Sequence, residues 1–337
     1  MKMTEAMHLG TNKLRGTLRN DVDMRRYTSW RAGGNVERMY QPADLADLQL
    51  YLSNLAENES VLAVGLGSNL LVRDGGLRGT VLLLHAALTE LRLEQDGTVY
   101  AQAGIPGAKL ARFAANNNLR GGEFFAGIPG TVGGMLTMNA GCYGGETWAV
   151  VERVQTIDRL GALHDISIVE YEIGYRHVER IGDQGLRIEC GSDPQSSILN
   201  PASQEFFVGA WFRLQQGDGE ISRKEIKALL SKRINSQPLS LPNAGSVFRN
   251  PPGDHAARLI DASGLKGKKI GGAQVSEKHA NFIVNVDHAT AADIENLIEE
   301  VRAVVKQKTG IELHPEVRIV GEYENNLNKT ENEQAKK

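Results

Sequence analysis

The sequence predicts an α+β protein of two domains, the first larger and rich in glycine, the second smaller. Three observations support this fold class. A chain of 337 residues is long enough to bury two hydrophobic cores. Its 37 glycines gather at 65–79, 104–145 and 264–272, and clustered glycines let a backbone approach a neighbour closely or adopt positive φ. Beyond residue 220, helix and strand patterns alternate more regularly.

The expected domain organisation has four segments. They are a flexible tail over 1–20, the larger domain over 21–215, the smaller domain over 216–321 and a disordered tail over 322–337. The final stretch, "YENNLNKTENEQAKK", is polar and nearly free of apolar residues, which is typical of disorder.

The larger domain is predicted to start with a helix from Pro42, because the leucines of "PADLADLQLYLSNL" fall on one face and proline suits the first turn. "VERVQTIDRLGALHDISI" alternates around a turn at Leu160 and Gly161, which predicts a hairpin. The other expected elements are strands at 61–65, 80–85, 98–104 and 206–214 and a helix at 106–118.

The smaller domain carries two helix-start signals. Ser222 and Glu225 have the spacing of a capping box, and Thr290 and Asp293 are expected to cap a long helix that Gly310 ends. The other expected elements are a short helix near 255–263, a strand at 279–286 and a final strand through "ELHPEVRIVG".

Composition and charge narrow the function classes. The chain is 41% hydrophobic and 23% charged with a net charge of −3, so no basic field predicts a nucleic-acid or membrane partner. Cys142 and Cys190 lie far apart and in no metal-ligand spacing, so neither a disulfide framework nor a metal site is expected. Because no apolar run reaches transmembrane length, we expect a cytoplasmic protein.

The first glycine-rich loop, "VGLGSNLLV", follows an expected strand. A Rossmann fingerprint would need glycine where Leu70 stands, and no Gly-Lys-Ser/Thr follows to make a P-loop. Two readings of these residues remain open: a simple strand–turn–strand, or a tight loop whose N–H groups, with Ser68 and Asn69, cradle a diphosphate.

The second loop, "GEFFAGIPGTVGGMLTMNAGCYGGE", is less ordinary. Its glycines and Pro129 give a long ordered connection with many free backbone donors, and its apolar content argues against disorder. Two such loops in one domain indicate a large ligand that carries a pyrophosphate.

The two loops, followed in order by "GYR", "NAGSVFRNP", "GGAQVSEKHANFIVN" and "LHPEVRIVG", closely resemble the UDP-N-acetylenolpyruvoylglucosamine reductase family, also called UDP-N-acetylmuramate dehydrogenase. The resemblance covers residues 24–321. It implies a vanillyl-alcohol-oxidase/PCMH-like FAD-binding domain followed by a smaller α+β substrate-binding domain. It also implies reduction of UDP-N-acetylglucosamine enolpyruvate to UDP-N-acetylmuramate by NADPH, in the synthesis of the peptidoglycan precursor.

The same resemblance places non-covalent FAD between the two loops. The implied cofactor-binding residues are Gly65, Gly67, Ser68, Asn69, Gly127, Ile128, Pro129, Gly130, Thr131, Gly133, Gly134 and Asn139. Tyr175, Gln237 and Asn250 are the expected substrate-side residues, and the protein is expected to act as a monomer.

Three residues match the family's catalytic positions. Hydride delivered from FAD N5 to the β-carbon of an α,β-unsaturated carboxylate leaves an enediolate-like species, which needs a clamp on its carboxylate and an acid for its α-carbon. Arg176 fits the clamp, because a guanidinium binds a carboxylate through two hydrogen bonds. Glu316 is expected to be partly desolvated and protonated or to act through a hydrogen-bond relay, and Ser246 to donate the proton.

Residues 178–205 depart from the family pattern. Family members resume a strand soon after the equivalent of Arg176, whereas this chain inserts "HVERIGDQGLRIECGSDPQSSILNPASQE". We expect an inserted or remodelled surface loop there.

Two other functions remain open at the level of sequence. An FAD-dependent oxidase of the same fold, acting on a hydroxy acid or alcohol, often binds flavin covalently through His or Cys, and Cys142 is the only nearby candidate. A non-catalytic nucleotide-binding module would not need Arg176, Ser246 and Glu316 together.

Overall fold

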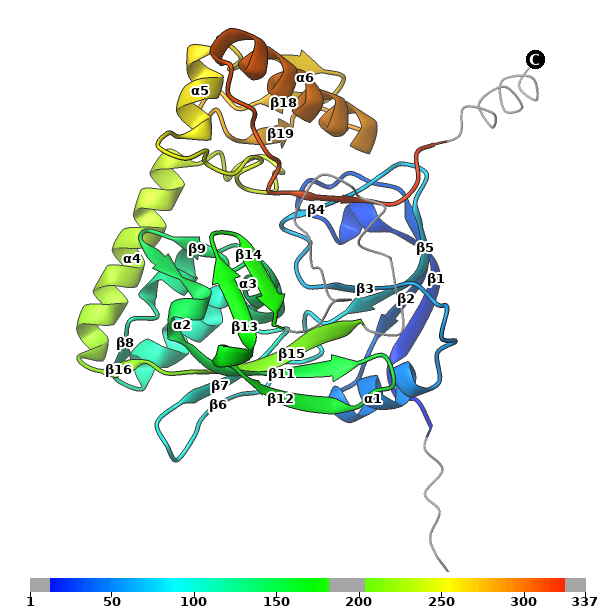
Figure 1. The fold of residues 1–337 in the computed structure, drawn as a ribbon, viewed down its shortest axis with the longest axis vertical. Coiled ribbons are helices and arrows are strands. Elements are labelled where there is room, and N and C mark those ends of the chain that lie inside the picture. The colour runs from blue at the N-terminus through cyan, green and yellow to red at the C-terminus, as the bar shows by residue number, and fades with distance from the viewer. Residues whose placement is uncertain (1–12, 182–203, 325–337) are drawn as a thin grey trace, which may run out of the picture.

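The computed structural model describes residues 13–181 and 204–324 (Figure 1). The outer parts of both expected tails and most of the expected insertion over 178–205 lie outside these residues. Within them, no helix combines the length and the apolar character needed to cross a membrane.

The N-terminal sheet has the strand order β1-β2-β5-β3. β1 pairs with β2 in antiparallel register, whereas β5 pairs in parallel with both β2 and β3. The strands are β1 (Thr17–Asp23), β2 (Asn35–Gln41), β3 (Val61–Val64) and β5 (Leu77–Leu83), and helix α1 (Leu45–Ser53) precedes β3.

Two expectations for this region need correction. Residues 17–20, expected in the flexible tail, belong to β1, because main-chain hydrogen bonds to β2 hold an edge strand whose side chains are mostly exposed. Helix α1 begins at Leu45 and not at Pro42, since the side chain of Asp44 accepts a hydrogen bond from the Asp47 N–H as the N-cap.

The second sheet is antiparallel, with the order β12-β11-β15-β7-β6. The strands are β6 (Leu91–Leu93), β7 (Val99–Gln102), β11 (Val151–Asp158), β12 (Leu163–Ser167) and β15 (Glu205–Phe212). The expected hairpin with its turn at Leu160 and Gly161 is confirmed as β11–β12. Helices α2 (Gly107–Asn116) and α3 (Val132–Thr137) share a hydrophobic core with this sheet.

Short elements complete the larger part of the molecule. The strand pairs are β9 (Gly141–Cys142) with β10 (Gly145–Glu146), β13 (Tyr171–Gly174) with β14 (His177–Arg180), and β8 (Leu119–Arg120) with β16 (Gln215–Gln216). The 3-10 helices are Met24–Arg26, Glu123–Gly127, Thr147–Val150 and Ile168–Glu170.

Helix α4 (Gly219–Ser236) runs along one side of the larger part and leads to the C-terminal domain (Figure 1). The expected capping box at Ser222 is wrong: Asp218 is the N-cap, and the Ser222 hydroxyl donates to Glu123 Oε1 at 2.6 Å. Ile226 packs into the same core as α2. The expected domain boundary at 216 stays a prediction, and α4 contacts the larger part.

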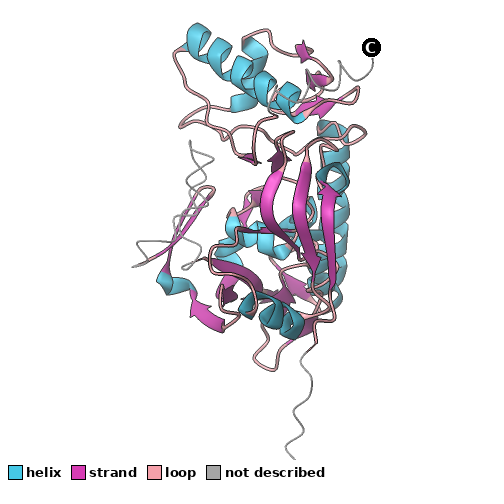
Figure 2. Cartoon of the chain, turned by 90° about the vertical axis from the view of Figure 1, so that its right-hand side faces the viewer, coloured by secondary structure: helices cyan, strands magenta, loops and turns pink. Residues whose placement is uncertain are grey.

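The C-terminal domain lies at one end of the molecule in both views (Figures 1 and 2). Its elements are α5 (Ala256–Ala262), α6 (Ala291–Thr309) and the sheet of β17 (Lys269–Ile270), β18 (Ala273–Val275) and β19 (Ile283–Asn285). The expected cap at Thr290 and Asp293 is confirmed as a capping box, and α6 ends at Gly310 with a φ of 74°.

The last strand returns to the larger part. β20 (Arg318–Val320) pairs in parallel with β4 (Leu70–Val72), the strand directly after the first glycine-rich loop. The Trp30 indole N–H donates to the Ile283 carbonyl at 2.8 Å and adds a buried contact between the two parts. The C-terminal domain is thereby held against the first glycine-rich loop.

Candidate active site

A cavity of about 790 Å³ lies between the two glycine-rich loops and the C-terminal domain. Most of the predicted site residues line it: Gly65, Gly67, Ser68, Asn69, Gly127, Ile128, Pro129, Gly130, Thr131, Gly133, Gly134, Arg176, Gln237, Ser246 and Glu316. Asn139, Tyr175 and Asn250 are not among its lining residues. The fold thus gathers segments from along the whole chain around one space.

The first loop packs too tightly for side chains at two of its glycines. Gly67 has a φ of +59°, and a Cβ there would lie 2.0 Å from the Tyr27 carbonyl oxygen. A Cβ on Gly65 would lie 2.3 Å from Thr131 Oγ1 of the second loop. Only glycine permits this close approach of the two loops.

The second loop leaves its backbone open at two glycines that line the cavity, although others in it, such as Gly127, are closely packed. An added Cβ would meet no heavy atom closer than 3.8 Å at Gly130 and none closer than 4.0 Å at Gly134. Both glycines line the cavity, so a ligand can approach their main chain directly. A cavity of this volume with bare backbone on one wall fits a dinucleotide cofactor such as FAD.

Arg176 is held in one orientation at the cavity wall. It has a φ of 54°, an uncommon value for a residue other than glycine. Its Nε donates to Glu316 Oε1 at 2.6 Å, and its two terminal nitrogens donate to the carbonyls of Asn139 at 3.1 Å and Gly141 at 3.2 Å. These three bonds fix the guanidinium before any ligand arrives.

Glu316 lies mostly buried, with 15% of its side chain exposed. Burial raises the pKa of its carboxyl, while Arg176 and, less strongly, Arg249 act in the opposite direction. The net direction is upward, which favours the protonated form beyond the usual range of a glutamate.

Ser246 lies half-buried on the cavity wall, on the segment that follows Gly245. Gly245 has a φ of +77°, and its N–H donates to Asn243 Oδ1 at 3.0 Å. The main-chain carbonyl of Val247, the residue after Ser246, accepts a hydrogen bond from the Glu316 N–H at 2.7 Å. Ser246 and Glu316 therefore sit on directly hydrogen-bonded neighbouring segments.

The other predicted residues occupy supporting places. Asn139 is 1% exposed, and its side chain donates to Gly174 O at 3.0 Å and accepts from the Trp148 N–H at 3.2 Å. The Asn250 side chain accepts from the Ala256 N–H at the start of α5. Tyr175 is 48% exposed, with its ring centroid 5.0 Å from the Arg176 guanidinium carbon. Their assignments to cofactor and substrate stay predictions.

Arg233 is a cavity residue that no sequence pattern singled out. It projects from the last turn of α4, and its Nε donates to Gln237 Oε1 at 3.0 Å. Burial lowers the pKa of its guanidinium, while Tyr143 and Cys142 raise it. An arginine near the end of a helix is usually a surface residue, so only the fold shows that it faces this cavity.

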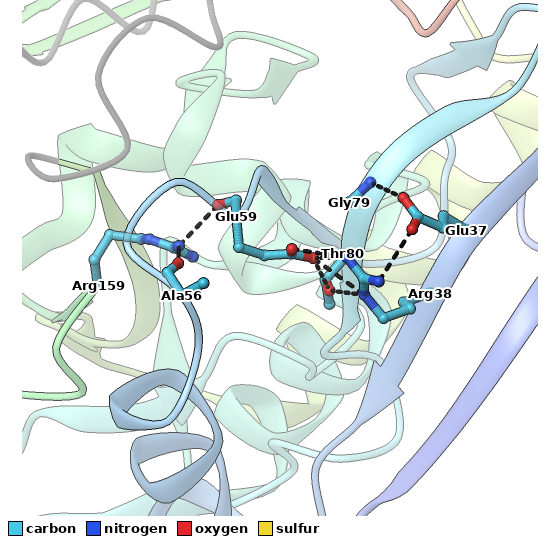
Figure 3. Close-up of polar contacts among 7 residues, drawn as sticks. All are labelled: Glu37, Arg38, Ala56, Glu59, Gly79, Thr80 and Arg159. Atoms are coloured by element: carbon cyan, nitrogen blue, oxygen red, sulfur yellow. Dashed lines mark hydrogen bonds and ion pairs between the residues drawn. The ribbon is translucent and has the colours of Figure 1, made fainter.

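A polar cluster around Glu59 includes Arg38 and Thr80 (Figure 3), and Thr80 also lines the cavity. The Thr80 hydroxyl donates to Glu59 Oε1 at 2.7 Å, and Arg38 Nη2 donates to both Glu59 carboxylate oxygens at 2.6 and 2.7 Å. Burial raises the pKa of Glu59, but the hydrogen bonds from Arg38 and Thr80 outweigh it and the net shift is downward. The ionised carboxylate thus joins β2, β5 and the turn before β3.

Among residues 13–181 and 204–324, no group of three or more His, Cys, Asp or Glu side chains could hold a metal ion. Cys142 lines the cavity as a free thiol, and its Sγ donates to the Phe124 carbonyl at 3.1 Å.

Comparison with known proteins first shows the class of protein to which this chain belongs. A family model described as an FAD binding domain matches residues 36–167, the part of the chain that carries both glycine-rich loops. Together with the cavity between those loops, this match defines a flavoprotein with a second domain after its FAD-binding domain.

A family model that matches the second domain, and relatives that match most of the chain, show the particular family. The model described as "UDP-N-acetylenolpyruvoylglucosamine reductase, C-terminal domain" matches residues 237–320. Reductases of that name from Nitrosospira multiformis and Nitrosomonas eutropha are 56% and 53% identical, over 91% and 95% of this chain and 90% and 94% of theirs. The chain therefore belongs to the UDP-N-acetylenolpyruvoylglucosamine reductase family and is an FAD-dependent oxidoreductase.

A solved structure agrees with this assignment. The crystal structure of the UDP-N-acetylenolpyruvylglucosamine reductase from Thermus caldophilus superposes with a TM-score of 0.72 at 28% identity, covering 91% of this chain and all of that one. The predicted family, fold class and cofactor are confirmed.

Proposed function

We propose that this protein reduces UDP-N-acetylglucosamine enolpyruvate to UDP-N-acetylmuramate, with FAD as its non-covalent cofactor and NADPH as reductant. The observation that carries the proposal is that Arg176, Glu316 and Ser246 line the same cavity as the two glycine-rich loops. Membership of the reductase family supports the same reaction.

FAD, when bound between the loops, supplies the hydride chemistry that none of the twenty side chains can perform. The main chain at Gly130 and Gly134 is open to receive it, and Ser68 and Asn69 offer polar groups from the opposite loop. The chain's own residues must bind, orient and protonate the substrate.

Arg176 is proposed to bind the substrate carboxylate. Its guanidinium is already fixed by the carbonyls of Asn139 and Gly141, so little conformational entropy is lost on binding. Glu316, with its raised pKa, is proposed to donate a hydrogen bond to a carboxylate oxygen as negative charge develops there. A protonated carboxyl can do this, whereas an ionised one would repel the charge.

Ser246 is proposed to give the proton to the substrate α-carbon. The carbanion formed at that position is a strong base, so a hydroxyl held close to it in a site shielded from water is an adequate donor. The serine hydroxyl then regains a proton from water when the product leaves. No base beside Ser246 is needed, since it is never a nucleophile in this scheme.

Arg233 and Gln237 are proposed to contact the nucleotide part of the substrate, since both line the cavity and are hydrogen-bonded to each other. We further propose a cytoplasmic monomer that makes the precursor for peptidoglycan and so supports cell shape and division. The net charge of −3 is consistent with small-molecule partners and not with nucleic acid.

The test is substrate-dependent reoxidation. Anaerobic enzyme reduced with NADPH should regain its oxidised flavin spectrum when UDP-N-acetylglucosamine enolpyruvate is added, with formation of one UDP-N-acetylmuramate per flavin. Recovery of the spectrum only with oxygen would favour an oxidase instead.

A further inference from the structure

Asn69 joins the first glycine-rich loop to the C-terminal domain. It is the last residue of the loop before β4, and its side-chain Nδ2 donates to the main-chain carbonyl of Glu316 at 3.0 Å. Its own carbonyl accepts the Arg318 N–H at 3.0 Å, and the parallel pairing of β20 with β4 continues from there. Asn69 is thus hydrogen-bonded to both Glu316 and Arg318 at the point where that strand pairing starts.

Glu316 is held from three directions. Its carbonyl accepts from Asn69, its N–H donates to the carbonyl of Val247, and its carboxylate accepts from Arg176. Val247 directly follows Ser246 in the chain. The Asn69 side-chain amide therefore links the first glycine-rich loop to Glu316. Glu316 is in turn hydrogen-bonded to Arg176 and to the residue that follows Ser246.

We infer that Asn69 is a positioning residue for the reaction: its side-chain amide, by holding the Glu316 main chain, sets the place of the Glu316 carboxyl relative to the cofactor loop. This inference rests on the proposed function. It assigns to Asn69 a role through Glu316, in addition to the cofactor-binding role predicted from sequence.

Replacing Asn69 by Asp should act mainly on the reoxidation half of the catalytic cycle. The variant keeps the size and one acceptor oxygen but loses the N–H donor, and its carboxylate oxygen then faces the Glu316 carbonyl, also an acceptor. Displacement of the Glu316 carboxyl by a fraction of an ångström to 1 Å should slow flavin reoxidation by the enolpyruvyl substrate by about 10- to 100-fold. Flavin reduction by NADPH uses no group on Glu316 in this scheme, so any slowing of reduction through the altered FAD contact should be much smaller than the slowing of reoxidation.

Asn285→Asp is the matched control. Asn285 Nδ2 donates to the Trp30 carbonyl at 3.0 Å, another amide-to-carbonyl bond between the two parts of the molecule, and its Oδ1 accepts from the Ala289 N–H. The substitution also removes one donor and keeps one acceptor, but Asn285 does not line the cavity. The rates of both half-reactions of N285D should stay close to those of the wild type.

The experiment is anaerobic stopped-flow of both half-reactions for wild type, N69D, N285D, E316Q and the double variant N69D/E316Q, with the FAD dissociation constant and the Tm of each. If Asn69 acts through Glu316, N69D should slow reoxidation little further in the E316Q background, because the two changes share one mechanism. Should N69D not fold, N69A removes the same donor without adding a charge and takes its place.

The possible results distinguish a failure of the inference about Asn69 from a failure of the proposed function on which it rests. Reoxidation that slows much more than reduction in N69D, with non-additivity with E316Q, supports the inference. Equal slowing of both half-reactions, full additivity with E316Q, or an effect confined to FAD affinity overturns it and leaves Asn69 as a cofactor contact only. Failure of wild-type reduced enzyme to react with the enolpyruvyl substrate would instead overturn the proposed function.

Discussion

The Nε of Arg176 donates a hydrogen bond of 2.6 Å to Oε1 of Glu316, although the two residues stand 140 positions apart in the chain. Their side chains are only 13% and 15% exposed. Arg176 follows β13 in the larger part of the molecule, and Glu316 lies two residues before β20. The candidate active site therefore exists only when the C-terminal domain is docked on the FAD-binding domain.

Replacing Ser246 with Ala should separate the two half-reactions. Reduction of the flavin by NADPH should be unaffected, whereas reoxidation by the enolpyruvyl substrate should slow by about 10²- to 10⁴-fold, because only the second step needs the proton from Ser246. Rapid mixing under anaerobic conditions measures both rates. An equal loss in the two half-reactions would rule out the role of proton donor.

Glu316 should make stability depend on pH. Because burial raises its folded-state pKa above the unfolded value, its protonated form stabilises the fold at pH values below the unfolded pKa, and that contribution is lost as pH rises through the folded pKa. Glu316→Gln cannot ionise but can still accept from Arg176. The Tm of E316Q relative to wild type should therefore increase as pH rises from about 4 to neutral; a constant difference would show that the carboxyl does not titrate in this range.

Part of this architecture could be predicted from sequence because its signals are local. The β11–β12 hairpin and the α6 capping box depend on residues within a few positions of one another, and the glycine loops carry their own backbone requirements. Each was found where it was expected.

The remainder depends on contacts between distant residues. Ser222 has the spacing of a cap but is hydrogen-bonded to Glu123, 99 positions away. The pairing of β20 with β4 and the place of Arg233 in the cavity are likewise tertiary results that no short pattern encodes. The family resemblance supplied the three proposed catalytic residues, whereas the support of Arg176 by the Asn139 carbonyl became visible only in the fold.

Gly67 should tolerate no side chain. A Cβ there would lie 2.0 Å from the Tyr27 carbonyl oxygen, a backbone atom that cannot move aside freely. Gly67→Ala should reduce the free energy of unfolding by at least about 3 kcal/mol, beyond the 1–2 kcal/mol of a left-handed conformation alone, and should weaken FAD binding.

Gly97 provides the control for this substitution. It also has a positive φ, of +82°, but an added Cβ would meet no heavy atom within 4 Å. G97A should thus show only the conformational cost. Denaturant unfolding and FAD titration of both variants test the difference, and equal destabilisation would mean that the predicted clash at Gly67 is relieved by movement of the loop.

Cys142 should not be joined to the flavin. Burial raises the pKa of its thiol to about 11, so at neutral pH it is a thiol and not the reactive thiolate. Acid precipitation of the holoprotein should release all FAD into the supernatant, and Cys142→Ala should stay yellow. Flavin that remains in the protein pellet and is freed only by proteolysis would support the oxidase alternative.

The most direct test of the proposed reaction is the anaerobic visible spectrum of the flavin in the wild-type holoenzyme, recorded through one catalytic cycle. The proposed reaction requires bleaching on addition of NADPH and full recovery on addition of UDP-N-acetylglucosamine enolpyruvate without oxygen. Bleaching with no recovery until oxygen is admitted would contradict it.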